Sequence, residues 1–130
     1  MAADDHIPAY VREHGPREVP VRVLRFTNEN AMLKREPGWQ HDNRLAKTLA
    51  KEGPLAVVLS LERAGTTVRE HHAAGPVTLQ CLEGTLRLHY AGHPLELVPG
   101  EMVVLDAGIP HEHEAITDCA VLITMTQAHA

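Results

Sequence analysis

Three of the ten histidines have a spacing that could hold a metal ion. His71 lies in the segment "REHHAAGP", and His111 and His113 lie in "PHEHEA". Imidazole is the commonest protein ligand of transition metals, and it titrates near neutral pH. If the second segment is extended, the two-residue period of a strand puts His111 and His113 on one face. We therefore expect His71, His111 and His113 to form a site for zinc, nickel, iron or copper, with a metal-free site as the alternative.

Acidic residues are not expected among these ligands. If His71 points inward, the alternation of a strand turns its neighbours Glu70 and His72 away, so we expect both at the rim of the site. Strand ends or turns also hold Glu83, Glu101, Glu112 and Glu114. The sequence therefore predicts no interior carboxylate, and it disfavours chemistry that needs a buried carboxylate base.

The elements that would position these residues are short strands separated by turns. From residue 53 onward, apolar or alternating stretches are separated by turn segments such as "RAGT", "VPGE" and "DAGIP". The expected strands are Leu55–Leu61, Val77–Leu82, Thr85–Tyr90, Glu96–Val98, Met102–Asp106 and Cys119–Thr126. Short strands at a spacing of about ten residues predict an all-β sandwich or barrel.

The N-terminal part of the chain carries weaker signals. Residues Val19–Phe26 predict a strand that nearby prolines confine to an edge or a bulge. The segment "REPGWQ" predicts a turn. The segment "NRLAKTLAKEG" has the composition of a short helix, although tertiary context could make it a strand. The length of 130 residues suits one domain, and we expect an arm over residues 1–38 and a barrel over 39–130.

Composition excludes several classes of partner. The formal net charge is −5, with 12 basic and 17 acidic residues, and no basic run could neutralise phosphates, so we expect no nucleic-acid partner. No apolar stretch approaches the roughly 20 residues of a membrane span, and "MAADDHIPAY" lacks the pattern of a signal peptide. We therefore expect a cytoplasmic protein with no membrane partner. Cys81 and Cys119 are expected as free, buried thiols.

Two glycine-anchored segments resemble the signature motifs of the small single-domain cupins. The first family motif is Gly, five residues, His, one residue, His, three or four residues, Glu, six residues and Gly. Gly65, His71 and Gly84 stand at this spacing in "GTTVREHHAAGPVTLQCLEG". Ala73 stands where the family has its second histidine, and Val77 stands where it has the glutamate. The first motif therefore keeps its glycines and one of its three metal ligands.

The second segment, "GEMVVLDAGIPHEHEA", resembles the other motif of the family. That motif is Gly, five residues, Pro, one residue, Gly, two residues, His, three residues and Asn. Gly100, Gly108 and His111 match it, while Asp106 and Ala115 replace the proline and the asparagine. In the family, the histidine of this motif completes a divalent metal site with four protein ligands. This chain keeps two of those four ligands. A catalytic metal usually needs about three protein ligands, which is why His113 is considered as a replacement.

The resemblance implies a fold and an assembly. It predicts an antiparallel cupin β-barrel, also described as a double-stranded β-helix or jelly roll, preceded by the N-terminal arm. Within this fold "AKTL" would be a strand, which decides the ambiguity noted above. The wider likeness is to an uncharacterised bacterial subgroup. The family usually dimerises across a sheet, so we expect a homodimer.

The interior of such a barrel would bind a small, mostly apolar molecule with one polar group. Its expected lining residues are Val77, Leu79, Cys81, Met102, Val104, Leu122 and Thr124. Three functions remain open. The first is a small-molecule-binding barrel, with or without a divalent metal. The second is a metal-dependent dioxygenase or isomerase acting on a small organic substrate, and the third is a non-catalytic regulatory or stress-related barrel.

Overall fold

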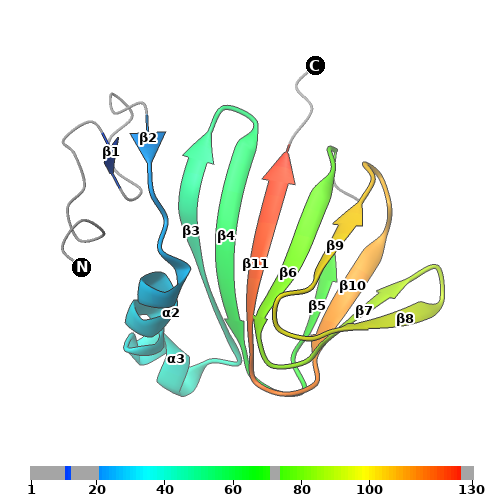
Figure 1. Cartoon of the computed structure of the whole chain (residues 1–130). Helices are drawn as coiled ribbons and strands as arrows, with labels where there is room; N and C mark the ends of the chain where they lie inside the picture. The colour runs from blue at the N-terminus through cyan, green and yellow to red at the C-terminus, as the bar shows by residue number, and fades with distance from the viewer. Residues whose placement is uncertain (1–10, 13–20, 71–73, 127–130) are drawn as a thin grey trace.

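The computed structural model describes residues 11–12, 21–70 and 74–126 of the chain. Two antiparallel sheets face each other as an open barrel (Figure 1). The larger sheet has the strand order β3-β4-β11-β6-β9, and the smaller sheet has the order β5-β10-β7-β8. A parallel pair, β1 and β2, precedes them. The bounds are β1 Val11–Arg12, β2 Val21–Arg22, β3 Arg44–Glu52, β4 Leu55–Glu62, β5 Thr67–Glu70, β6 Val77–Glu83, β7 Leu86–Tyr90, β8 His93–Leu97, β9 Met102–Leu105, β10 His111–Ala115 and β11 Cys119–Thr126.

The all-β architecture expected from the sequence is confirmed. Every strand expected from residue 55 onward overlaps an observed strand, and β5 and β10 are added to them. The segment "NRLAKTLAKEG" forms strand β3 and not a helix, as the resemblance implied. Pairing with β4 along almost its whole length supplies the tertiary context that overrides its helical composition.

The region before β3 differs from the expectation. The expected strand Val19–Phe26 is wrong, because within the described residues strand pairing is limited to β2 and Phe26 begins helix α2 (Phe26–Lys34). The expected turn in "REPGWQ" contains the start of a short helix, α3 (Pro37–His41). Helix α2 contains no proline or glycine, and it places Leu33 two turns after Phe26, so both face the sheet. The expected boundary after residue 38 falls inside α3.

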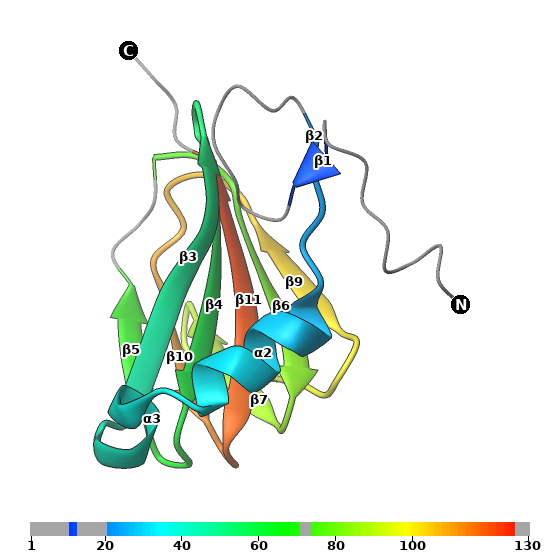
Figure 2. The same cartoon turned by 90° about the vertical axis from the view of Figure 1, so that its left-hand side faces the viewer.

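Two hydrophobic clusters lie on opposite faces of the larger sheet. The inner cluster lies between the sheets and contains Val77, Leu79, Cys81, Leu86, Leu88, Leu97, Leu105, Ala115, Cys119, Val121 and Ile123. Helices α2 and α3 lie over the outer face of the larger sheet (Figure 2). The outer cluster lies between them and the sheet and contains Leu33, Trp39, Leu49, Leu59, Leu61, Ala120 and Leu122. Strand β11 contributes to both clusters because successive side chains of a strand point to opposite faces.

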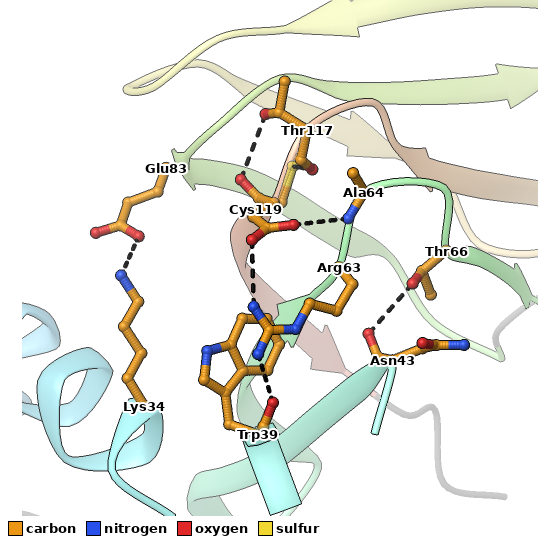
Figure 3. Close-up of polar contacts among 10 residues, drawn as sticks. Lys34, Trp39, Asn43, Arg63, Ala64, Thr66, Glu83, Thr117 and Cys119 are labelled. Atoms are coloured by element: carbon orange, nitrogen blue, oxygen red, sulfur yellow. Dashed lines mark hydrogen bonds and ion pairs between the residues drawn. The ribbon is translucent and has the colours of Figure 1, made fainter. Parts of the chain in front are cut away.

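Polar contacts fasten the helices to the sheet (Figure 3). The Arg63 guanidinium lies 3.7 Å from the ring centroid of Trp39 and donates a 2.6 Å hydrogen bond to the Trp39 carbonyl. Lys34 Nζ lies 2.7 Å from Glu83 Oε1 at the end of β6. These contacts hold α2 and α3 over the outer cluster. Within the described part of the chain, no helix is long and apolar enough to cross a membrane.

Gly84 shows why the first motif needs its last glycine. Its φ is +82°, in the left-handed region that only glycine adopts without strain. A Cβ at this position would also collide with the carbonyl oxygen of Asp118. Both constraints arise where the chain turns from β6 into β7, beside the start of β11. The motif residue therefore serves the backbone of the barrel and not the chemistry of the site.

Candidate functional site

Strand β10 brings two of the predicted histidines to one face. His111 and His113 are 7% and 0% exposed, and Ala115 continues the same buried row. Glu112 and Glu114 alternate with them on the other face and are half-buried. The condition stated in the sequence analysis is met, because the segment is extended and both imidazoles lie on its inner face. The antiparallel pairing of β10 with β5 and β7 keeps this segment extended.

His113 is held by a buried carboxylate from the opposite sheet. Its Nε2 lies 3.0 Å and 2.9 Å from the two carboxylate oxygens of Glu62, the last residue of β4. Both side chains are fully buried. Because an ionised carboxylate only accepts hydrogen bonds, Nε2 carries the proton and its N–H donates a hydrogen bond to Glu62. The contact joins the two sheets across the barrel interior.

The buried carboxylate is itself supported by two residues. Ser60 Oγ donates a 2.7 Å hydrogen bond to Glu62 Oε2 and accepts a 2.9 Å hydrogen bond from Arg44 Nε. Arg44 Nε lies 3.7 Å from Glu62 Oε2. The Arg44 side chain is 37% exposed, so its charge is shared between water and the buried network. A buried charge is tolerated only with such partners.

One atom of this network has no hydrogen-bond partner in the described part of the chain. The Nδ1 atom of His113 is buried and forms no hydrogen bond with any described residue. With the proton on Nε2, Nδ1 of the neutral ring carries a free lone pair. Leaving a buried polar atom unsatisfied costs about 1–3 kcal/mol. The arrangement therefore fixes an imidazole in one tautomer and leaves its other nitrogen available inside the barrel.

The prediction that the interior lacks a carboxylate is wrong, because Glu62 lies there. Sequence reasoning missed Glu62 because it ends the apolar run "LAVVLSLE" and reads as the polar end of a strand. The available signal was the alternation of Ser60 and Glu62 with Leu59 and Leu61. Both faces of this stretch are buried, one under the helices and one in the barrel, so its polar residues had to point into one of them.

His111 is oriented by its own turn and lies beside a cavity. Its Nδ1 lies 3.0 Å from the carbonyl oxygen of Ile109, to which the ring N–H donates, so its Nε2 is left with a free lone pair. The cavity has a volume of about 670 Å³, and we call it the rim cavity. It is lined by Arg69, His89, Ala91, Gly92, Pro110, His111 and Glu112. It lies where β5 ends, β10 begins and β7 turns into β8.

The predicted lining residues of the barrel divide into two groups. Val77, Leu79 and Cys81 are buried in the inner cluster, as expected. Met102 and Val104 are 49% and 66% exposed, so their predicted interior position is wrong. Their neighbours Val103 and Leu105 pack against the inner cluster in their place. Strand β9 is apolar on both faces, so its sequence pattern does not determine which residues point inward.

Leu122 is also placed on the wrong face by the sequence prediction. It belongs to the outer cluster with Leu33 and Trp39, while its neighbours Val121 and Ile123 belong to the inner one. Thr124 has the same phase along β11 as Leu122. Helix α2, which the sequence analysis did not predict, covers this face and makes an apolar residue favourable there.

The remaining predicted residues lie at the edge of the described structure. His71 and His72 fall outside the described residues. Glu70 is the last residue of β5, and its backbone pairs with His111. Among residues 11–12, 21–70 and 74–126, no three His, Cys, Asp or Glu side chains converge as a metal site. The three-histidine site therefore stays a prediction.

The two cysteines are buried free thiols, as expected. Burial raises the pKa of the Cys119 thiol to about 11, with smaller contributions from Cys81 and Glu62. Burial likewise raises the pKa of Cys81, and the charge of Glu101 adds to it. Cys119 Sγ donates to the carbonyl oxygens of Thr85 and Thr117 at 3.1 and 3.2 Å. Neutral thiols in such positions are packing groups and not nucleophiles.

Comparison with known proteins identifies the family of this arrangement. Residues 57–126 match the Cupin domain family. No curated protein matches the chain. A cupin-2 domain protein from Shewanella frigidimarina is 20% identical, with a TM-score of 0.64 over 81% of this chain and 95% of that one. A cupin superfamily protein from Desulfitobacterium hafniense is 18% identical, with a TM-score of 0.64 over 67% of this chain and 80% of that one.

A larger enzyme shares the same fold. Salicylate 1,2-dioxygenase from Pseudoaminobacter salicylatoxidans, in adducts with gentisate, is 17% identical and has a TM-score of 0.70. The similarity covers 82% of this chain and 33% of that one. At these identities the solved structures indicate the architecture alone.

Proposed function

This chain belongs to the cupin family, and from that premise we propose that it binds a small molecule inside its barrel through His111 and His113. The single observation that carries the proposal is the buried Nδ1 of His113, which has no hydrogen-bond partner among the described residues. A hydrogen-bond donor or a metal ion placed there would recover the free energy lost by an unsatisfied buried nitrogen. The surrounding inner cluster is apolar, so it favours a mostly apolar ligand with one polar group.

A divalent transition metal is part of this proposal. Metal-ligating histidines donate their second ring N–H to a carboxylate or a carbonyl, which fixes the tautomer and the ring orientation. His113 does so to Glu62, and His111 does so to Ile109. The two imidazoles therefore fit a metal in donor type, and His71 is the predicted third ligand. A bound ion would supply Lewis-acid chemistry toward a carbonyl oxygen.

Metal analysis of the purified protein tests the site. We expect zinc, nickel, iron or copper to be bound in stoichiometric amount and lost in His111→Ala and in His113→Ala. His41→Ala, which changes an exposed histidine of α3, is the matched control and should keep the metal. In a metal-free protein, a small ligand should raise the melting temperature of wild type and His41→Ala but not of His113→Ala. The site is refuted if all three variants bind metal and ligand alike.

A metal-dependent dioxygenase or isomerase is the second candidate. The His113–Glu62 pair favours it, because a metal-ligating imidazole that donates its second N–H to a carboxylate is fixed in orientation and made more basic. The shared fold with salicylate 1,2-dioxygenase supplies an assay. We expect oxygen uptake with salicylate or gentisate after loading with iron, and its loss in His111→Ala. If iron binds but no oxygen is consumed, the enzymatic candidate fails while the binding proposal stands.

A further inference from the structure

We propose that the rim cavity is a second ligand site, for a small organic acid that also carries a hydrogen-bond donor. Its volume of about 670 Å³ lies within the range of small-molecule sites, roughly 300–1,000 Å³. The cavity shares His111 with the barrel interior, but its charged groups lie on the other face of β10. Arg69, Glu112 and His89 form one cross-strand row, and Glu112 alternates with His111 and His113, so this row lies on the opposite face of β10 from the His113 ring.

Arg69 is the group that would bind the acid. It pairs in register with Glu112, yet it has no hydrogen bond or ion pair among the described residues. The next row of the same face behaves differently. Arg87 lies 2.7 Å from Glu96 and 4.0 Å from Glu114, so its charge is already matched. Arg69 thus remains as a planar guanidinium at a cavity wall, and its geometry suits a carboxylate.

The other polar groups of the lining limit the charge of the ligand. Among the described residues they are His89, His111 and Glu112. At neutral pH the positive charge of Arg69 is balanced across the cavity by the negative charge of Glu112, so a doubly charged phosphate would be repelled by the carboxylate. A monoanion with a hydroxyl or ammonium group would match both. Its carboxylate would bind Arg69, and its donor would bind Glu112.

The turn beside the rim cavity is a second, independent indication that the cavity binds a ligand. Ala91 and Gly92 form a two-residue turn between β7 and β8, with φ values of +50° and +78°. Asparagine, aspartate or glycine usually occupies the first of these positions, because alanine is strained there. Strain of this kind concentrates at binding sites. Alanine also presents no polar atom at this wall, which leaves the cavity room for an apolar part of the ligand.

Titration with mandelate tests this site. Mandelate carries one carboxylate and one hydroxyl, mandelamide lacks the charge, and phenylacetate lacks the hydroxyl. We expect mandelate to shift the backbone amide NMR signals of Ala91, Gly92 and Glu112, and to bind about tenfold more tightly than mandelamide. Arg69→Gln should remove this preference, and Glu112→Gln should remove the preference over phenylacetate. Arg35→Gln, an exposed arginine at the end of α2, is the matched control.

Three results would overturn the proposal. The first is no saturable shift with mandelate, or shifts that map elsewhere. The second is equal affinity for mandelate and mandelamide, or equal affinity in Arg69→Gln and Arg35→Gln. The third is inorganic phosphate binding as tightly as mandelate. His113→Ala should leave mandelate binding unchanged, so failure of this site and failure of the interior site can be told apart.

Discussion

Glu62, Ser60 and His113 place a carboxylate, a hydroxyl and an imidazole in contact where all three are fully buried. Burying such groups in place of apolar side chains seldom adds stability, because desolvation offsets the attraction between them. We therefore expect these three side chains to serve the proposed binding site and not the stability of the fold. The network fixes which nitrogen of His113 carries the proton, and that choice decides what the barrel interior can bind.

Removing the charge of Glu62 should destabilise the fold. Glu62→Gln keeps the volume but weakens the hydrogen bonds from His113 and Ser60 and leaves Arg44 without its buried counter-charge. We expect the free energy of unfolding to fall by about 2–3 kcal/mol, measured by urea denaturation. Glu96→Gln breaks an exposed ion pair and should cost less than about 1 kcal/mol. Equal losses in the two variants would contradict the importance of the buried network.

Cys119 should react slowly with alkylating reagents in the folded protein. Its pKa of about 11, against an ordinary 9.0, leaves roughly a hundredth of the usual thiolate near pH 8. The pKa of Cys119 is higher in the folded protein than in the unfolded chain. The contribution of this thiol to the free energy of unfolding is therefore present below pH 9 and is lost as the pH rises toward 11. Iodoacetamide labelling followed by mass spectrometry should therefore be slow at pH 8, should keep rising with pH toward about 11, and should increase after unfolding in urea. Rapid labelling of the folded protein at neutral pH would contradict this prediction.

At the scale of elements, the alternation of polar and apolar residues predicted both the position and the inward-facing residues of some strands. For other strands it predicted only the position. In β10 the order of histidines and glutamates sets the phase, so both His111 and His113 were placed correctly. In β9 both faces are apolar, so the position was predicted while the phase was not. In the same way, Glu62 was missed because helix α2 buries the outer face of β4, and this helix had not been predicted.

The turn after β6 should tolerate no side chain. Gly84→Ala adds both a left-handed alanine and a collision with the Asp118 carbonyl. Gly53→Ala adds the left-handed alanine alone, because a Cβ there meets nothing. We expect the second variant to lose about 1 kcal/mol of unfolding free energy and the first to lose at least about 2 kcal/mol more. Thermal or urea unfolding measures both, and similar losses would show that the collision is relieved by a small shift.

At the scale of the whole molecule, each sheet has two open edges. In the part of the chain that the structure describes, no strand pairs with the outer sides of β3, β5, β8 and β9. Unpaired edges are usually covered, because they can pair with other chains. The exposed apolar residues Met102 and Val104 on β9 add an apolar surface at one of them. We propose that the homodimer expected from the family resemblance forms at the edge strand β9.

We expect light scattering to give the mass of a dimer at micromolar concentration. Val104→Lys, which places a charge on the exposed face of β9, should shift the protein toward the monomer. Val21→Lys changes an equally apolar exposed residue on β2 and should leave the mass unchanged. A wild-type monomer would refute the dimer, and dissociation by Val21→Lys alone would place the contact at the other end of the molecule.

Strand β11 belongs to both clusters, since Ala120 and Leu122 pack under the helices while Val121 and Ile123 pack between the sheets. Its central place in the larger sheet means that neither layer can open without losing contacts along this strand. The helical cover and the barrel are therefore expected to melt as one cooperative unit, so that a ligand bound on the inside also slows the exposure of the helices on the outside.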